Sequence, residues 1–144
     1  MSDIPAPLPS HPADPAPHAG RAARIAGWII GGLPALMIIV GGVMNASKAQ
    51  FAIDGLKQMG YPEAVSVPLG VASIVCGLLY LIPQTAVFGA LLLTAYMGGA
   101  VATHVRAGDA LADSAPAVVF CALLWIGLLL RDRRLRELLP LRKI

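Results

Sequence analysis

Charged residues are scarce in this chain of 144 residues. Asp, Glu, Lys and Arg make up only 13% of it, about half of their usual share in soluble proteins. Hydrophobic residues make up 57%, and the mean hydropathy is +0.73. A soluble domain of this size cannot cover so much apolar surface with so few charges. The composition therefore excludes an ordinary soluble domain and predicts an integral membrane protein.

The missing charges leave three long uncharged runs. Residues 25–47, 64–103 and 114–130 form runs of 23, 40 and 17 residues that contain neither a charged residue nor a histidine. A helix needs about 20 apolar residues to cross a bilayer. Pro83 and Gln84 divide the middle run into two segments of 19 residues, because a proline and its neighbour favour a helix boundary. The sequence predicts four spans, at about 27–44, 65–82, 85–103 and 115–130.

The alternating pattern of a membrane β-barrel is also missing. In lipid every backbone amide must find a partner within the protein, so the spans are expected to be helices. We predict an all-α, up-down-up-down bundle of four transmembrane helices within residues 24–144. Residues 1–23 are predicted to be a disordered cytoplasmic tail, because six of the twelve prolines fall in the first twenty residues.

The basic residues are distributed unevenly along the chain. Eight lie toward the two ends, and three lie in the segments that follow the first and third spans. The eight are Arg21, Arg24, Arg131, Arg133, Arg134, Arg136, Arg142 and Lys143, and the three are Lys48, Lys57 and Arg106. Since Lys and Arg are retained on the cytoplasmic side, we predict a multi-pass protein of the cell (inner) membrane with both termini cytoplasmic. The lipid bilayer is the expected partner, and the net charge of +3 needs no nucleic-acid partner to explain it.

The segment between the first two spans has a weak helical pattern. Ala52, Leu56 and Met59 recur at helical spacing, and Gly60 with Pro62 ends the pattern. This favours a short amphipathic helix on the outer surface and an ordinary connecting loop about equally. Within the first span, Gly31, Gly32 and Pro34 indicate a kink or a close helix contact, and Gly41 and Gly42 indicate a second point of close approach.

Several motifs of catalysis are lacking. The two cysteines, Cys76 and Cys121, form no C-x-x-C motif, which disfavours a thiol–disulfide exchange enzyme. We interpret both as small apolar residues of the spans. No Asp or Glu lies within a span, which disfavours a proton-coupled transporter. There is no phosphate loop, zinc-protease motif or nucleophile elbow. The sequence names no reaction and predicts no metal site.

The third span ends in an unusual polar sequence, "GGAVATHVR". Tyr96, Thr103, His104 and Arg106 form a candidate polar cluster, in which Tyr96 and His104 are two helical turns apart and can line one small cavity. A functional cluster at membrane depth is one interpretation. The simpler one is an interfacial segment, in which His and Arg reach toward water or cap helix carbonyls.

Small residues precede this polar end. Ala95 and Gly99 are four residues apart, as are Gly98 and Ala102. This spacing lets another helix backbone approach closely. It predicts a packing notch on the third span.

These motifs together resemble the DoxX-like family of small four-span membrane proteins. The matching stretches are "GYPEAVSVPLGVASIVCGLLYLIPQTAVFGALLLTAYMGGAVATHVRAGD" and "LLWIGLLLRDRRLRELLPL", and the resemblance covers about residues 27–141. The family pattern has Gly-Tyr-Pro before the second span, Leu-Gly within it, Pro after it, and Gly-Gly-Ala-x-x-Thr-His-x-Arg ending the third. Here these are Gly60, Tyr61, Pro62, Leu69, Gly70, Pro83, Gly98, Gly99, Ala100, Thr103, His104 and Arg106.

The resemblance implies a membrane partner of a redox system. Relatives resemble thiosulfate:quinone oxidoreductase subunits and components of complexes that handle oxidative stress. It thereby implies a quinone as the candidate cofactor, membrane or cytoplasmic redox proteins as candidate partners, and a functional role for Thr103, His104 and Arg106.

Three functions remain open. We favour a non-catalytic membrane subunit or scaffold in a redox-linked complex. The alternatives are a quinone- or lipid-binding oxidoreductase component and a small passive transporter. Whether the protein is an enzyme is left undecided by the sequence.

Overall fold

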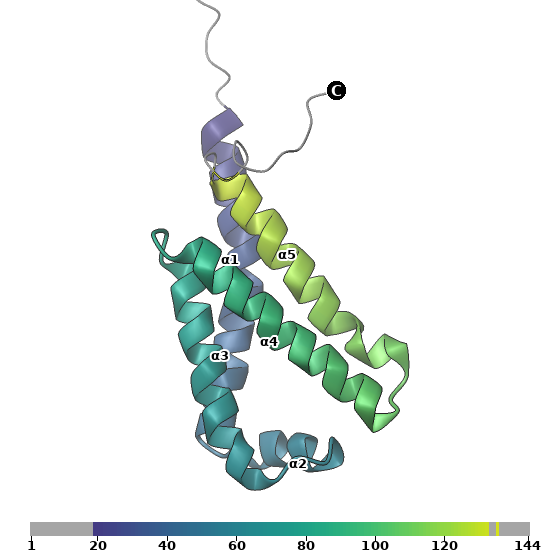
Figure 1. The fold of residues 1–144 in the computed structure, drawn as a ribbon. Coiled ribbons are helices and arrows are strands. Elements are labelled where there is room, and N and C mark those ends of the chain that lie inside the picture. The colour runs from purple at the N-terminus through teal and green to yellow at the C-terminus, as the bar shows by residue number, and fades with distance from the viewer. Residues whose placement is uncertain (1–18, 133–134, 136–144) are drawn as a thin grey trace, which may run out of the picture.

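The computed structural model describes residues 19–132 and residue 135. Its described residues form helices joined by short turns (Figure 1). The α-helices are α1 (Ala19–Ala46), α2 (Gln50–Gln58), α3 (Ser66–Leu81), α4 (Ala86–Ala107) and α5 (Ala115–Arg131), and the 3-10 turns are η1 (Glu63–Val65) and η2 (Leu111–Ser114). The predicted all-α fold is confirmed.

Four of the helical segments are long and apolar enough to cross a membrane. They are Gly20–Ala46, Glu63–Leu81, Ala86–Ala107 and Ala112–Arg131. The predicted number of long apolar helices is therefore confirmed, and each segment is longer than its expected span, the first by the largest margin. The third continues past residue 103 because His104 to Ala107 remain compatible with a helix, which ends only where Gly108 adopts the left-handed conformation, with φ of 79°.

The predicted N-terminal tail, residues 1–23, extends too far along the chain. Helix α1 already begins at Ala19, within the segment assigned to the tail. Arg21, Ala22 and Ala23 are good helix formers, and no proline interrupts them before Pro34. The rest of the predicted tail, residues 1–18, lies outside the described residues.

The segment after the first span is a helix rather than a loop. Helix α2 buries Ile53 and exposes the polar side chains of Asp54 and Lys57. It lies across the end of the α1–α3 pair that is opposite to the start of α1 and the end of α5 (Figure 1). Of the two interpretations that the sequence left open, the structure supports the amphipathic helix.

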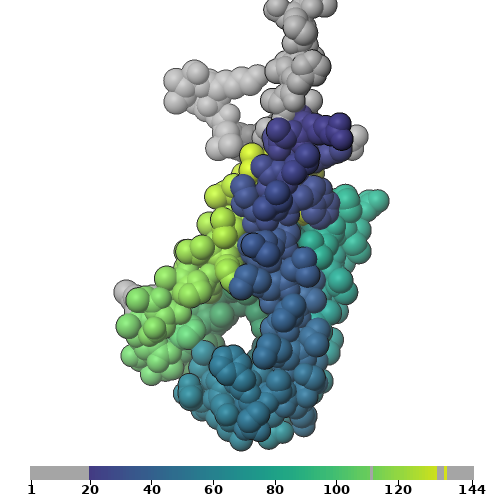
Figure 2. All heavy atoms as spheres, turned by 180° about the vertical axis from the view of Figure 1, so that it is seen from behind, coloured from purple at the N-terminus to yellow at the C-terminus, as the bar shows by residue number. Residues whose placement is uncertain are grey.

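Helix α1 is the central helix of the bundle. It packs most extensively against α3 on one side and α5 on the other, while α4 packs against α3 and α5. At the end where α1 begins, the helices lie close together, and α4 and α5 diverge from α1 and α3 toward the α2 end (Figure 1). Figure 2 shows the consequence, a hole through the molecule between the helices at that end.

Glycines hold α1 against its two neighbours. A Cβ atom on Gly127 of α5 would lie 2.5 Å from both Cα and N of Gly31, and one on Gly70 of α3 would lie 2.5 Å from the carbonyl oxygen of Gly42. Only glycine permits backbones to approach so closely. Of the four glycines at which close approach was expected in this helix, Gly31 and Gly42 make close contacts, whereas Gly32 and Gly41 do not among the described residues.

The predicted notch on α4 makes no contact within the part of the chain that the structure describes. Ala95, Gly98, Gly99 and Ala102 are exposed, and no described atom lies within 4 Å of a Cβ built on either glycine. Small-residue spacing shows only that a helix can be approached, not that a helix of the same chain approaches it. Helix α4 packs through the other side, where Gly89, Ala90, Leu93, Met97 and Thr103 are buried.

Replacing Gly127 with Ala tests the α1–α5 contact. The added methyl group overpacks the helix crossing, and we expect a loss of about 1–3 kcal/mol in stability and a lower midpoint of thermal unfolding in detergent, measured by circular dichroism. Gly41→Ala is the matched control, because no atom lies within 4 Å of its Cβ position. Equal unfolding temperatures for the two variants would show that the glycine contact does not hold α1 to α5.

Candidate ligand pocket at the end of α4

The last turn of α4 positions His104. Gly108 turns the chain out of the helix, and the backbone N–H of Asp109 donates to the carbonyl oxygen of His104 at 3.1 Å. The turn brings a carboxylate oxygen of Asp109 to 2.8 Å from Nδ1 of the His104 ring. The His104 side chain is 21% exposed. The imidazole is thus held in place by the residue five positions after it.

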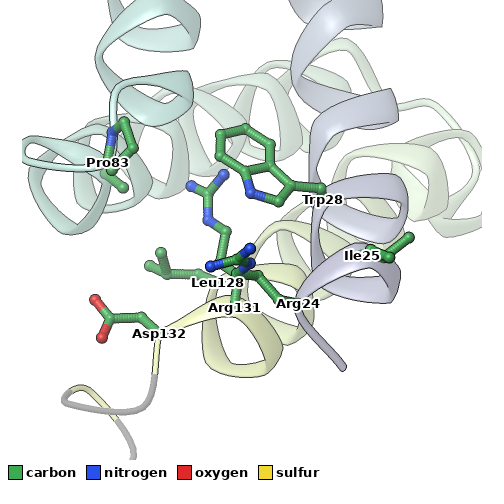
Figure 3. Close-up of a pocket in the computed structure, with 8 residues that line it drawn as sticks. Arg24, Ile25, Trp28, Pro83, Leu128, Arg131 and Asp132 are labelled. Carbon is green, nitrogen blue, oxygen red and sulfur yellow. The ribbon is translucent and has the colours of Figure 1, made fainter. Parts of the chain in front are cut away.

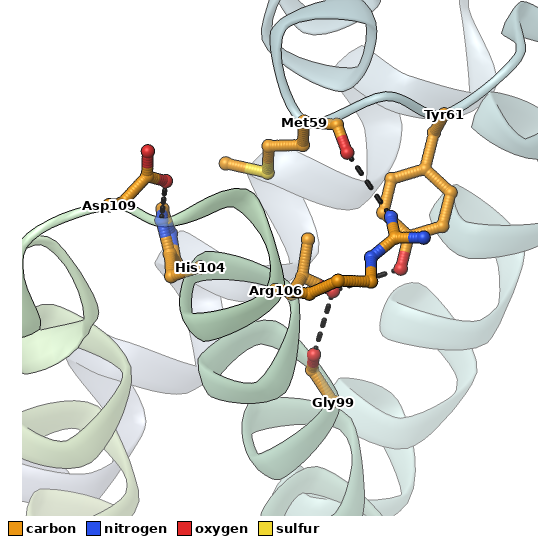
Figure 4. A network of polar contacts seen from close by, with 7 residues as sticks. Met59, Tyr61, Gly99, His104, Arg106 and Asp109 are labelled. Atoms are coloured by element: carbon orange, nitrogen blue, oxygen red, sulfur yellow. Dashed lines mark hydrogen bonds and ion pairs between the residues drawn. The ribbon is translucent and has the colours of Figure 1, made fainter.

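Thr103 points to the other side of α4, toward the segment between α2 and α3. Its hydroxyl group lies 2.9 Å from the hydroxyl group of Tyr61 and donates to the carbonyl oxygen of Gly99, also at 2.9 Å (Figure 4). Because Thr103 has a single proton to donate, Tyr61 is the donor in the contact between the two hydroxyl groups. Both hydroxyl protons are then used within the protein.

Arg106 reinforces the same connection. Its Nη2 donates to the carbonyl oxygen of Met59 at 3.2 Å, and its Cζ lies 5.0 Å from the centre of the Tyr61 ring. That distance is within the range of a cation–π contact. Thr103 and Arg106 therefore fasten the α2–α3 segment to the end of α4, whereas His104 faces Asp109 (Figure 4).

A pocket of about 370 Å³ lies between these segments. One wall comes from α2, the segment that follows it and the first turn of α3, and the other comes from α4. The lining residues are Leu56, Met59, Tyr61, Leu69, Ala95, Tyr96, Gly99, Ala100, Thr103 and His104. The wall is mainly apolar, and its polar groups are three hydroxyls and one imidazole. Such a combination suits a ligand with an apolar body and a small polar group.

A second pocket of about 270 Å³ adjoins the first. Tyr96 and His104 line both pockets, and α1, η2 and α5 supply the opposite wall of the second. The second pocket therefore lies among α1, α4 and α5.

Of the predicted polar cluster, three members lie at the first pocket and one does not. Tyr96, Thr103 and His104 line it, while Arg106 lies over Tyr61 beside it. Two of the small residues of α4, Gly99 and Ala95, also line this pocket.

Sequence reasoning missed Tyr61 and Asp109 as members of the site. Tyr61 precedes its partner Thr103 by 42 residues, and nothing in helical periodicity connects the two. A signal did exist, since Tyr61 belongs to the Gly-Tyr-Pro motif and Asp109 to the Gly-Asp turn. Tyr61 was interpreted only as part of the family pattern, and Asp109 was given no functional role.

The fold and pocket define a class of protein. Four apolar helices of spanning length, with their polar side chains gathered at the ends, make an integral, multi-pass membrane protein. The chain belongs to the DoxX-like family, whose sequence profile matches residues 29–127. No curated protein and no solved structure shows significant similarity to it.

Thr103→Val tests whether the hydroxyl pair fastens the α2–α3 segment. The substitution removes the acceptor of the Tyr61 hydroxyl group, and we expect the free energy of unfolding to fall by about 1–3 kcal/mol. We also expect faster hydrogen–deuterium exchange of the amides in residues 57–62. Ala102→Val is the control, because it introduces the same side chain on the exposed face one residue earlier. Unchanged exchange in Thr103→Val would contradict the fastening role.

Proposed function

We propose that this DoxX-like protein is an integral membrane subunit of a redox-linked complex, and that its pocket at the end of α4 binds a lipid-soluble ligand of the quinone type. One observation carries the proposal. Polar side chains from two distant segments, Tyr61 on one side and Thr103 and His104 on the other, converge on one mainly apolar pocket of about 370 Å³.

The His104–Asp109 pair gives the pocket a defined hydrogen-bonding character. With Asp109 ionised, the Nδ1 proton of His104 lies in the 2.8 Å contact with its carboxylate, so the neutral ring has its lone pair on Nε2. Nε2 makes no hydrogen bond with another described residue. A hydroxyl group is the matching partner, and the reduced form of a quinone carries two. His104 can then accept a hydrogen bond, or a proton, from a quinol hydroxyl while remaining paired with Asp109.

The direction of the openings favours a lipid-soluble ligand over transport. The hole in Figure 2 is seen from the side of the helices, so it runs across the bundle and not along it. A passage between the two membrane faces would have to follow the helix axes. Sideways openings instead lead to the surrounding acyl chains, where a quinone is dissolved.

Replacing Gly99 with Leu tests the pocket by filling it. Gly99 lines the pocket and has room for a side chain. We expect Gly99→Leu to abolish saturable binding of a short-chain quinol to the purified chain in detergent micelles. Gly98→Leu is the matched control, since Gly98 has equal room and lies outside this pocket. His104→Ala is expected to weaken binding about tenfold, through the loss of one hydrogen bond to the ligand.

Two results would count against this proposal. Quinol binding that survives in Gly99→Leu as well as in Gly98→Leu would place the ligand elsewhere. Binding that is unaffected by His104→Ala would remove the imidazole from the site. In both variants circular dichroism shows whether the helices remain folded.

We also propose that both ends of the chain lie in the cytoplasm, where their basic residues can contact redox partners. The excess of Lys and Arg toward the ends supports this orientation. With Cys76 and Cys121 replaced by Ala, a cysteine introduced at Ser2 or Ile144 is expected to resist an impermeant thiol reagent in intact cells, whereas one at Lys57 reacts. The reverse labelling pattern, or opposite results for the two ends, would refute the orientation.

A further inference from the structure

A second polar pocket lies at the other end of the bundle, away from the proposed quinone site. It has a volume of about 500 Å³ and is formed where the start of α1, the α3–α4 turn and the end of α5 meet. Arg24 and Trp28 come from α1, Pro83 from the turn, and Arg131 and Asp132 from the end of α5 (Figure 3). Two arginines against one carboxylate leave the wall of this pocket positively charged.

Arg131 is held inside the bundle end rather than extended into water. Its Nη2 donates to the carbonyl oxygen of Tyr80 at 2.7 Å, and its Cζ lies 4.4 Å from the ring centres of both Trp28 and Tyr80. An arginine that only marks the end of a span would point toward the headgroups and water. Here two aromatic rings fix the position of the guanidinium group.

The aromatic support is itself rigid. Tyr80 is fully buried, and its hydroxyl group donates to the carbonyl oxygen of Leu124 at 2.7 Å. Gly31 makes this possible, because a Cβ atom there would collide with the Tyr80 hydroxyl oxygen. The guanidinium group is thus positioned before any ligand arrives, which lowers the entropy cost of binding.

The hydrogen bonding of Arg131 is incomplete. Its Nη1 is buried and has no partner among the described residues. A buried N–H group of a charged side chain without a partner is costly, and in proteins it commonly marks the place of a missing ion or water molecule. The adjoining pocket is lined by Arg131 and by Arg24, so two positive charges border the same space (Figure 3).

We propose that this pocket binds the phosphate group of an anionic ligand, either a phospholipid headgroup or a small phosphate compound. A phosphate group carries its negative charge on several oxygens and suits a pocket bordered by two guanidinium groups, of which Arg24 has no hydrogen-bond partner among the described residues. The pocket lies at the end of the spans, beside the indole of Trp28, at the depth where headgroups are found.

The two tryptophans of the chain allow a direct measurement. Trp125→Phe leaves Trp28, which lines the pocket, as the only fluorescent indole. The purified full chain in maltoside micelles, which contain no phosphate, is titrated with dioctanoylphosphatidylglycerol, with inorganic phosphate, and with dioctanoylglycerol as the phosphate-free control. We expect a saturable change in Trp28 emission with a phosphate-bearing probe and none with dioctanoylglycerol.

Variants test the arginines. Arg24 makes no hydrogen bond or ion pair with another described residue, so Arg24→Gln leaves the fold intact and is expected to weaken binding about fivefold, the effect of one basic residue near a headgroup. Arg21→Gln removes the same charge from the same helix outside the pocket and is expected to change binding little. Arg131→Gln is expected to abolish binding, with circular dichroism reporting on folding.

The two sources of phosphate are separated by the titrations. Binding of the lipid alone assigns the pocket to a headgroup, whereas binding of inorganic phosphate assigns it to a small phosphate compound. The proposal is overturned if neither probe gives a saturable change, or if Arg21→Gln weakens binding as much as Arg24→Gln does.

Discussion

The close backbone contacts of α1 are the constraint on which the rest of the structure depends. In a bilayer the lipid tails are as apolar as the side chains, so helices gain little from hiding apolar surface and associate mainly through tight packing. Gly31 against Gly127 and Gly42 against Gly70 provide that packing. Helix α1 is the helix common to both contacts, which makes it the centre of the bundle.

The positions of these contacts explain the shape of the molecule. The contact with α5 involves Gly31, and the contact with α3 involves Gly42, about three turns further along α1. Beyond Gly31, therefore, α5 is free to diverge from α1 while α3 remains attached to it. Helix α4 packs against α3 and α5 and is carried away from α1 as α5 diverges (Figure 1). The two pockets at the α2 end occupy the space that this divergence leaves.

The spans could be predicted from sequence because their signal is local. An uncharged run of sufficient length commits a segment to lipid whatever its neighbours are, and a left-handed Gly108 ends a helix by its own geometry. Glycine contacts can be predicted only in part, because the sequence indicates candidate glycines but not their partners. The sequence indicated Gly31, Gly32, Gly41 and Gly42 as places of close approach, but it could not assign Gly127 and Gly70 to two of them, and it predicted a contact at Gly98 and Gly99 that the described residues do not make. Which small residues meet is decided by how the helices turn about their axes.

The pockets could not be predicted from the sequence for the same reason, because they depend on how distant segments pack together. Thr103, His104 and Arg106 were recognisable as polar residues at the end of a span, yet Tyr61 became their neighbour only through the folding of the α2–α3 segment onto α4. Arg131 shows the limit more clearly. In sequence it is one of several arginines that follow an apolar run, with nothing to distinguish it from an ordinary flank. Its position between Trp28 and Tyr80 depends on three helices that meet at one end of the bundle.

The polar side chains are paired at one end of the bundle and leave excess positive charge at the other. This difference in charge determines which class of ligand each end can bind. At the α2 end the hydroxyl groups of Tyr61 and Thr103 bond each other, Arg106 bonds a carbonyl oxygen, and Asp109 offsets the charge that a protonated His104 would carry. Little net charge remains there, so a neutral amphipathic molecule is the suitable ligand. At the other end a buried donor of Arg131 has no partner among the described residues, and Arg24 adds charge of the same sign. Positive charge held at the depth of the headgroups attracts an anion, so the pockets of one small bundle are suited to ligands of different classes.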